Sequence, residues 1–326
     1  MKRVLSGLRP TGKIHIGNYF GALINWVNLQ KEYECFYEVA DWHVLTTDYK
    51  NTEKIKEYII EAVCDWISIG IDPEKSVIFI QSKVKEHAEL YLLFGMLISI
   101  ARLERNPTVK EQVRDLGLEE NISYGHLGYP VLQASDILIY KANLVPVGED
   151  QLPHIEITRE IARRFNYLYG ETFPLPEPIL TKTPRVPGID GKARMSKSLN
   201  NTIFVDEEPE ELERKIMKAY TDPMKIKLGD PGHPDGCVVF AYHSLIDGKE
   251  NPEIREGCES GKLGCVECKK NCINKMVSFL APFREKKKEL KKNIKRIIEI
   301  IEVGNKKAQE VAKNTLEDVR EKMKLW

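Results

Sequence analysis

The chain has 326 residues, of which 42% are apolar and 30% charged, a composition that excludes a disordered protein and leaves room for two globular domains. It carries 49 basic and 49 acidic residues, so a surface for nucleic acid could arise only from local clustering of charge. The longest apolar run, residues 90–100, is too short to span a bilayer, and the N-terminus lacks the apolar core of a signal peptide. We therefore expect a cytoplasmic protein without a membrane partner.

The beginning of the chain predicts alternating strands and helices. Short strands are expected at residues 4–5, 35–40 and 77–80, and apolar residues recur at helical spacing in residues 20–33 and 55–67. This order is the half-unit of a doubly wound parallel sheet, which binds ligands at the carboxyl ends of its strands. The turn after the first strand should lie at that end of the sheet.

A helix is expected at residues 86–102, and the polar segment that follows it, residues 106–123, interrupts the alternation. We interpret this segment as an insertion on the surface in preference to a direct catalytic role. The pattern then resumes with an apolar helix at residues 129–139, a fourth strand at 144–148 and a helix at 149–165. The α/β part of the chain thus continues beyond the insertion.

Residues 173–187 contain five prolines and indicate a domain boundary near residue 190. Beyond residue 207 the sequence predicts no strand, and helices are expected at residues 210–219, 272–283, 286–303 and 306–323. The predicted architecture is α/β in three parts: a doubly wound, Rossmann-like parallel-sheet domain (1–190), a mobile loop with a linker (191–205) and a mostly helical C-terminal domain (206–326).

The turn after the first strand has the features of an anion site. Residues 6–19 read Ser-Gly-Leu-Arg-Pro-Thr-Gly-Lys-Ile-His-Ile-Gly-Asn-Tyr, so glycines lead directly into a helix. The N–H groups and the positive dipole end of a helix attract phosphate, and glycines let it approach the backbone. His15 should reach the same phosphates. For this turn alone, a helix cap formed by His15 is an equally good interpretation.

A second stretch, Gly-Lys-Ala-Arg-Met-Ser-Lys-Ser at residues 191–198, has three cations and two hydroxyls and suits a mobile clamp on a polyphosphate. Together, His-Ile-Gly-Asn at residues 15–18 and Met-Ser-Lys-Ser at residues 195–198 resemble the two signature motifs of the class I aminoacyl-tRNA synthetases. Asn18 replaces the final histidine of the first motif, as is usual in tryptophanyl enzymes. Arg194 replaces the first lysine of the second motif. The planar guanidinium group of arginine is not equivalent to the compact ammonium group of lysine.

Further stretches resemble the tryptophanyl-tRNA synthetases in particular. They are Gly-Tyr-Pro-Val-Leu-Gln-Ala-Ser-Asp-Ile-Leu at residues 128–138 and Val-Pro-Val-Gly-Glu-Asp-Gln at 145–151. The resemblance covers residues 1–205 at the level of motifs and the rest by helical character. The alternatives are a tyrosyl-tRNA synthetase, which shares the fold and several motifs, and a synthetase-like protein that binds RNA without catalysis.

Asp136 favours tryptophan over tyrosine. Indole has one N–H donor and no acceptor, and a carboxylate on an otherwise apolar helix answers that donor. A phenol both donates and accepts, and archaeal-type tyrosyl enzymes place a tyrosine where this chain has Leu5. A buried polar group that loses its partner is costly, which is how such sites reject analogues.

The resemblance implies that tryptophan reacts with ATP, assisted by Mg²⁺, to tryptophanyl-adenylate and pyrophosphate, and is then transferred to tRNA(Trp). His15, Lys197 and Arg194 are expected to act in catalysis. Tryptophan is expected to contact Asp136, Tyr129, Gln151, His43 and Leu5, whereas His154 is expected to be a packed helix residue. The residues expected to contact ATP come from both motifs and from the segment after residue 147: Arg9, Pro10, Thr11, Gly17, Asn18, Gly148, Glu149, Asp150, Val186, Arg194, Met195, Ser196, Lys197 and Ser198.

The resemblance also assigns roles to the three predicted parts. Residues 1–190 would be the catalytic domain that binds ATP and tryptophan, with the insertion at about 84–127 as the interface of a homodimer. Residues 206–326 would bind the anticodon. Lysines beside a group of cysteines, Lys262, Lys269, Lys270 and Lys275, could contact the tRNA or serve only solubility.

Five of the seven cysteines fall within residues 237–272, which in a reducing cytoplasm favours a metal over disulfides. Cys237, Cys258, Cys265 and Cys268 form the predicted ligand set, with Cys272 as a competing fourth ligand. Four thiolates fit either Zn²⁺ or an iron–sulfur cluster. The resemblance to a subset of bacterial tryptophanyl enzymes implies a [4Fe–4S] cluster, with Zn²⁺ as the alternative.

Overall fold

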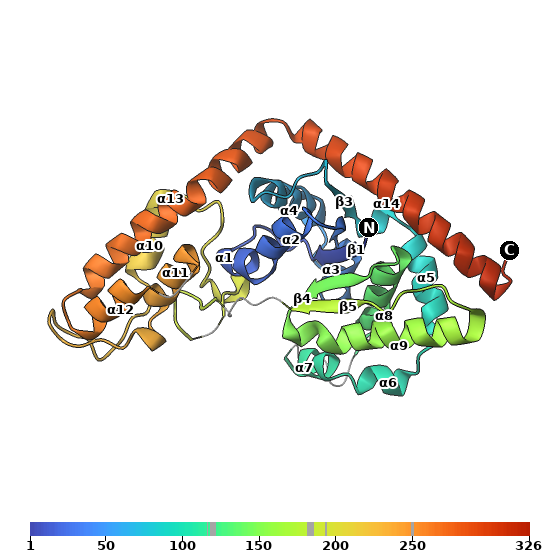
Figure 1. The fold of residues 1–326 in the computed structure, drawn as a ribbon, viewed down its shortest axis with the longest axis horizontal. Helices are drawn as coiled ribbons and strands as arrows, with labels where there is room; N and C mark the ends of the chain where they lie inside the picture. Colours follow the sequence, from blue (N-terminus) through green and yellow to red (C-terminus); the bar gives the residue numbers. More distant parts are fainter. Residues whose placement is uncertain (116, 118–121, 181–185, 193, 249–250) are drawn as a thin grey trace. The chain divides into compact units, whose positions relative to one another are not determined.

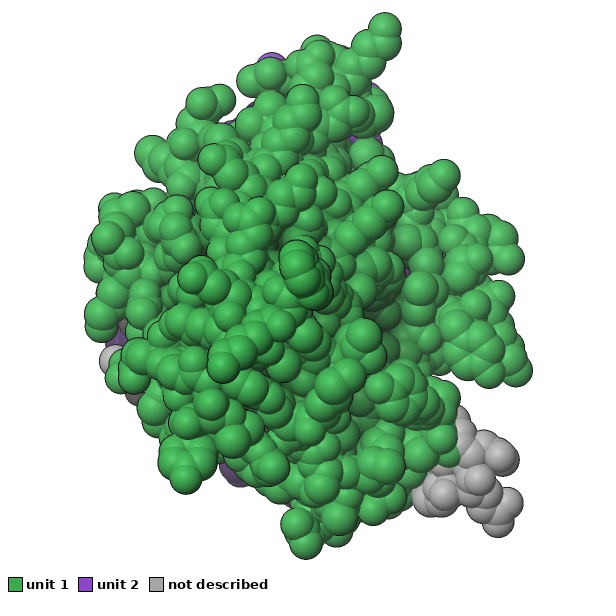
Figure 2. All heavy atoms as spheres, turned by 90° about the vertical axis from the view of Figure 1, so that its right-hand side faces the viewer, with its two compact units in different colours: residues 1–12, 25–181, 293–326 green, residues 13–24, 182–292 purple. Residues whose placement is uncertain are grey.

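A computed structural model describes residues 1–115, 117, 122–180, 186–192, 194–248 and 251–326 (Figure 1). Parts of the predicted insertion, of the proline-rich crossing and Ala193 lie outside these residues. Among the described residues, no helix combines the length and apolarity that a membrane crossing requires. The chain forms two compact units, coloured separately in Figure 2. Unit 1 comprises residues 1–12, 25–181 and 293–326, and unit 2 comprises residues 13–24 and 182–292.

Unit 1 is built on a five-stranded sheet in which all neighbouring strands are parallel. The strand order is β3-β2-β1-β4-β5, with β1 Arg3–Leu8, β2 Glu34–Val39, β3 Ser76–Ile80, β4 Leu144–Val147 and β5 Glu177–Leu180. This confirms the predicted doubly wound, Rossmann-like fold. The order reverses between β1 and β4, so ligands are expected beyond the carboxyl ends of these two strands.

Strand β5 lies in the proline-rich crossing, where the sequence predicts no strand. Pro178 is tolerated because β5 is the edge of the sheet and needs ladder hydrogen bonds on one side only. The prolines therefore correctly indicate a break in the α/β pattern, but the expectation that this segment contains no strand is wrong.

The helices of unit 1 cover both faces of the sheet. They are α2 Ile24–Leu29, α3 Asp41–Asp48, α4 Ile55–Ser68, α5 Glu86–Gly95, α6 Ile100–Glu104, α7 Pro107–Asp115, α8 Tyr124–Ile139, α9 Leu152–Tyr169 and α14 Ile294–Met323. The predicted surface insertion is only partly on the surface. Asn106 and Val109 are buried, and α7 occupies much of the segment that the sequence predicts as an insertion.

The C-terminal helix α14 belongs to unit 1 rather than to a separate helical domain. It runs along the edge strand β3, where Oδ1 of Asn305 accepts the N–H of Ile80 at 2.9 Å. Gly304 lets the helix approach, because a Cβ there would lie 1.8 Å from the carbonyl oxygen of Ile78. The two helices predicted at residues 286–303 and 306–323 are thus replaced by one helix after a break at Asn293.

Unit 2 is mostly helical, with α1 Ile16–Asn18, α10 Pro209–Met217, α11 Val238–Asp247, α12 Pro252–Glu259 and α13 Cys265–Lys292. The early segment 13–24 joins it because the N–H of Ile16 donates to the carbonyl of Ile203 at 2.9 Å and His15 pairs with Phe204 in an antiparallel bridge. Tyr19 and Phe20 then pack against Phe279 and Phe283 of α13. The compact units therefore divide the chain differently from the predicted boundary near residue 190.

Candidate active site

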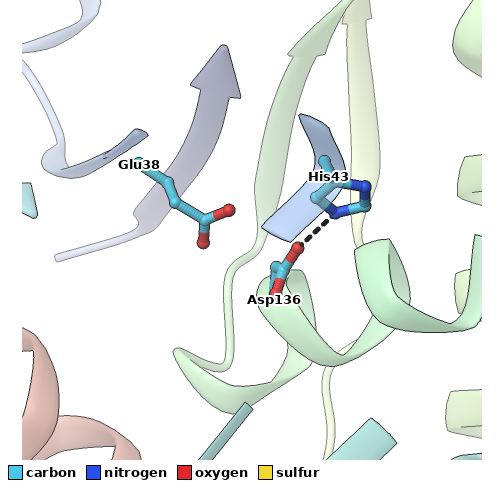
Figure 3. Close-up of side chains that lie close together, drawn as sticks. All are labelled: Glu38, His43 and Asp136. Atoms are coloured by element: carbon cyan, nitrogen blue, oxygen red, sulfur yellow. Dashed lines mark hydrogen bonds and ion pairs between the residues drawn. The ribbon is translucent and has the colours of Figure 1, made fainter. Parts of the chain in front are cut away.

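Asp136 on α8 is the centre of a buried hydrogen-bond cluster in unit 1 (Figure 3). Its Oδ2 accepts a hydrogen bond from Nε2 of His43 at 2.8 Å, and the amide of Gln81 donates to its two oxygens at 3.0 and 2.9 Å. Nδ1 of His87, on α5, lies 2.5 Å from Oδ1. The predicted neighbours His43 and Asp136 therefore meet, and Gln81 and His87 complete the cluster.

Asp136 is ionised although it is only 3% exposed. Burial alone would raise the pKa of the carboxyl group, but the hydrogen bonds from His43 and His87 and the charges of these rings lower the pKa of Asp136 to about 2. An ionised carboxylate is an acceptor only, so the cluster attracts an N–H donor.

A second acid, Glu38 on β2, lies beside this cluster (Figure 3). It is 2% exposed, and its Oε2 lies 3.8 Å from Nδ1 of His87 and has no hydrogen-bond partner among the described residues. Burial and the neighbouring Asp136 raise the pKa of Glu38 well above its usual range. Neither Glu38 nor His87 belongs to a predicted motif, and the only signal in the sequence is a charged residue within an apolar strand.

Glu38, His43 and Asp136 could also hold a metal ion, because one ligand atom from each lies within 4.8 Å of the others. An ion there would displace the hydrogen bond between His43 and Asp136 and compete with Gln81 for the same carboxylate. Since N–H donors already satisfy both oxygens of Asp136, we interpret the cluster as a hydrogen-bond network.

Tyr129, one of the predicted tryptophan contacts, is oriented by two polar side chains. Its hydroxyl is bonded to Nε2 of His154 and accepts a hydrogen bond from the amide of Gln112 at 3.1 Å. Burial lowers the pKa of His154 to about 4, so this ring is neutral. His154 is fully buried, as the sequence predicts, yet it also positions Tyr129, and Gln112 comes from the segment interpreted as an insertion.

The residues of unit 1 that are predicted to contact ATP follow the two strands between which the sheet order reverses. Arg9, Pro10 and Thr11 follow β1, and residues 148–150 follow β4. The amide of Gln151 donates to Oδ2 of Asp150 at 2.9 Å, so these two predicted contacts support each other. Leu5 lies within β1 and is buried in the core, so any contact with a ligand would be through its apolar side chain.

In unit 2, His15 forms the N-cap of α1. Its Nδ1 accepts the backbone N–H of Asn18 at 3.2 Å, and Oδ1 of Asn18 accepts the N–H of His15 at 3.1 Å. Because Nδ1 is an acceptor, the neutral ring carries its proton on Nε2, where it can serve a phosphate oxygen. The capping role and the phosphate role are therefore compatible.

The second motif lies close to His15. Burial, followed by the positive charges of Lys197 and Arg194, lowers the pKa of His15 to about 4. Unit 2 thus combines an uncharged imidazole with two cations. Gly17 permits this packing, because a Cβ there would lie 2.8 Å from Nδ1 of His15 and 3.4 Å from Cβ of Met195.

Hydrogen bonds anchor the second motif on both sides. The N–H of Met195 donates to the carbonyl of Val186 at 3.1 Å, and both side chains are buried. The N–H of Ser196 donates to Oδ1 of Asn201 at 2.7 Å, and the hydroxyls of Ser196 and Ser198 are 2.9 Å apart. Asn201, which no motif predicts, is 1% exposed and holds this loop in place.

The four predicted ligand cysteines line one cavity in unit 2, although they are far apart in the sequence: Cys237, Cys258, Cys265 and Cys268. Burial raises the pKa of Cys237 and raises that of Cys268 to about 12, so without a metal these thiols stay protonated. Cys272 is fully buried on α13 and does not line the cavity. No three of the four sulfur atoms, all of them in described residues, lie within 4.8 Å of one another.

Comparison with known proteins extends over nearly the whole chain. The family model described as tRNA synthetases class I (W and Y) matches residues 1–281. The chain is 53% identical over 326 residues to the tryptophan–tRNA ligase of Thermotoga maritima, which covers 99% of both chains. It is 46% identical over 394 residues to that of Aquifex aeolicus, covering 99% of this chain and 100% of the other. The tryptophanyl-tRNA synthetase of Campylobacter jejuni, solved with ADP and tryptophan, matches with a TM-score of 0.88 at 36% identity and covers 99% of this chain and 100% of that chain.

Proposed function

The chain belongs to the class I tRNA synthetases that serve tryptophan and tyrosine, and we propose that it activates L-tryptophan with ATP and transfers it to tRNA(Trp). The relatives with 53% and 46% identity are both tryptophan–tRNA ligases, which favours tryptophan over the tyrosine alternative. The intact His15, Lys197 and Asp136 favour an enzyme over a non-catalytic RNA-binding protein.

The observation that carries the choice of tryptophan is the ionised, buried Asp136. A carboxylate can accept the indole N–H, and its neighbours His43, Gln81 and His87 hold it in one orientation. Tyr129 and Gln151 bind the amino group of tryptophan, and Leu5 contributes an apolar wall. Tyrosine is rejected because its hydroxyl would need a partner that can both donate and accept.

Activation requires positioning and neutralisation of charge rather than a covalent enzyme intermediate. The carboxylate of tryptophan attacks the α-phosphorus of ATP in line, and the bond to the bridging oxygen breaks to release pyrophosphate. The Nε2–H of His15 and the cations Lys197 and Arg194 stabilise the charge that grows on the phosphates, and Mg²⁺ enters with ATP. A ribose hydroxyl at the 3′ end of the tRNA then attacks the adenylate.

The helical part of unit 2 binds the anticodon of tRNA(Trp). Lys262 and Lys270 are exposed beside the cysteine cavity and can contact phosphate. Lys269 donates instead to the carbonyl of Met217 at 2.8 Å, and Lys275 pairs with Asp247 at 2.7 Å, so these two lysines serve the fold.

The cysteine cavity holds a [4Fe–4S] cluster, with Zn²⁺ as the second candidate. Four thiols from separate segments line it, and Cys272 does not, which supports the set Cys237, Cys258, Cys265 and Cys268. These four cysteines would hold the cluster as thiolates, and the bound cluster would supply a link between the segments that carry them.

The protein acts as a homodimer through the region of residues 84–127. In this region the large apolar side chains of Leu92, Met96, Ile100 and Tyr124 are 58, 68, 65 and 74% exposed. Exposed apolar side chains grouped in this way are typical of protein interfaces. Sedimentation of the wild-type chain and of a Met96→Lys variant checks this proposal, since only the wild type should sediment as a dimer.

Exchange of pyrophosphate into ATP tests the proposed activity. Exchange should occur with tryptophan as the only amino acid and not with tyrosine. Exchange with tyrosine alone would establish the tyrosyl alternative, and exchange with neither would favour the non-catalytic one.

A further inference from the structure

Glu38 is closely packed against a neighbouring strand, and one oxygen of its buried side chain has no partner among the described residues. It pairs in register with Gly7 of β1, and a Cβ on Gly7 would lie 3.0 Å from the carbonyl oxygen and 3.1 Å from Cβ of Glu38. Its side chain enters the Asp136 cluster, and Oε2 has no hydrogen-bond partner among the described residues. A buried carboxyl oxygen without a donor indicates that the acid keeps its proton.

Several titratable groups surround Glu38. Asp41 and His43 come from α3, His87 from α5, and Asp136 and Tyr140 from the end of α8. None of these groups is a lysine or arginine that could pair with an ionised Glu38. Negative charge on Glu38 would therefore add to that of Asp136 within the same buried cluster.

The hydrogen bonds to Asp136 are satisfied when Asp136 is the ionised acid of the pair Glu38 and Asp136. The hydroxyl of Tyr140 donates to Nε2 of His87, and Nδ1–H of His87 donates to Asp136. Nε2–H of His43 and the amide of Gln81 also donate to Asp136. In this arrangement Asp136 is ionised, and Glu38 keeps its proton, which it can donate to Asp136 through the side-chain hydrogen bond between the two acids.

We propose that Glu38 is a positioning residue that holds one proton beside His87 and Asp136, so that Asp136 is the one ionised carboxylate that these two acids present to the indole N–H. This inference rests on the proposed function. Loss of that proton would place two anions in the cluster, and tryptophan, which excludes water from the slot, would then bind more weakly. Tryptophan binding should consequently favour the protonated form.

Infrared spectroscopy tests the proton directly. At neutral pH the difference spectrum between wild type and Glu38→Gln should contain the carbonyl band of a protonated carboxylic acid, and this band should shift when tryptophan binds. A control difference spectrum with Glu32→Gln, an exposed glutamate before the same strand, should contain only carboxylate bands. Carboxylate bands alone in the Glu38 spectrum would overturn the proposal.

Tryptophan affinity from pH 5.5 to 9.5 tests the consequence. The dissociation constants of wild type and Glu38→Gln should agree within about threefold at neutral pH, because the amide keeps the shape and a donor. At alkaline pH the wild type should weaken relative to the variant, by up to about tenfold per pH unit. The proposal is also supported if the infrared band of the protonated acid persists to pH 9.5 and the tryptophan affinity does not change with pH. In that case Glu38 keeps its proton over the whole range.

Two results would overturn the inference without touching the proposed activity. One is an alkaline loss of affinity that is identical in wild type and Glu38→Gln. The other is a stoichiometric divalent cation that is lost in Glu38→Gln, which would make the cluster a metal site. Pyrophosphate exchange with tryptophan at neutral pH, measured on the same proteins, reports separately on the activity. If Glu38→Gln fails to fold, the infrared pH titration of the wild type still decides, since a protonated band is either present or absent.

Discussion

The Nδ1 atom of His15 accepts the backbone N–H of Asn18 at 3.2 Å, and this hydrogen bond fixes which nitrogen of the neutral ring carries the proton. The side chain of Asn18 returns a hydrogen bond to the backbone of His15 at 3.1 Å. Two residues of the first signature motif therefore orient each other before any nucleotide binds, and Nε2–H is presented as a donor.

His15→Ala should lower kcat for pyrophosphate exchange about 100-fold and change KM for tryptophan less than about threefold, because one preorganised donor to the phosphates is lost. The matched control is His233→Ala, which removes a histidine whose side chain is 71% exposed in the same unit. A similar loss in the control would contradict the assigned role.

The pKa of His15, lowered to about 4, also predicts how stability depends on pH. The unfolded chain, with an ordinary histidine pKa of about 6.5, binds this proton first as the pH falls. The contribution of His15 to the stability of the folded state is therefore fully present above about pH 6.5 and is lost as the pH falls toward 4. The free energy of unfolding, measured with urea, should therefore fall between pH 7 and pH 5 by about 1–2 kcal/mol more in wild type than in His15→Gln. An equal fall in both proteins would show that His15 does not titrate in this way.

Asp136→Asn should raise KM for tryptophan about 10- to 100-fold, because a charge-assisted hydrogen bond to the indole N–H becomes a neutral one with the wrong donor pattern. Steady-state pyrophosphate exchange measures this change. Asp318→Asn, which removes a surface carboxylate paired with Lys141, is the control and should leave KM unchanged. A normal KM in Asp136→Asn would refute contact between Asp136 and the indole.

Lys197→Ala should slow adenylate formation about 100-fold while the dissociation constant of tryptophan stays within about threefold, because the ammonium acts on the phosphates. Single-turnover kinetics and equilibrium binding separate the two effects. Lys192→Ala, an exposed lysine in the same loop, is the control. Equal effects on binding and on chemistry would place Lys197 elsewhere in the reaction.

Protein purified without oxygen should show the broad visible absorption of an iron–sulfur cluster, with about four irons per chain. Cys265→Ser should abolish both signals, whereas Cys272→Ala should retain them, because Cys272 does not line the cavity. One zinc per chain and a colourless protein would establish the alternative ligand.

The sequence predicts those parts of the fold and the site that depend on local pattern. The parallel sheet follows from short apolar strands between helices, and residues such as His15, Asp136 and Cys265 fall in recognisable motifs. Glu38, Gln81 and Gln112 could not be found in this way. They reach the Asp136 and Tyr129 side chains only after segments far apart in the chain have packed.

The assignment of segments to the two units was also beyond local pattern. Residues 13–24 join unit 2 because the N–H of Ile16 donates to the carbonyl of Ile203 and the N–H of Val205 donates to the carbonyl of Ile14. Helix α14 joins unit 1 through Gly304 and Asn305. Such contacts depend on how the surfaces of two distant segments fit together. The hydrophobic spacing and the composition of either segment alone do not predict this fit.

The position of α14 on β3 has a consequence for biosynthesis. A ribosome completes β3 long before it synthesises the helix that covers it, so the nascent chain exposes an unprotected strand edge throughout most of its elongation. Closure of unit 1 is therefore a late event in translation, and chaperones that shield strand edges should associate with the growing chain until Gly304 and its neighbours have emerged.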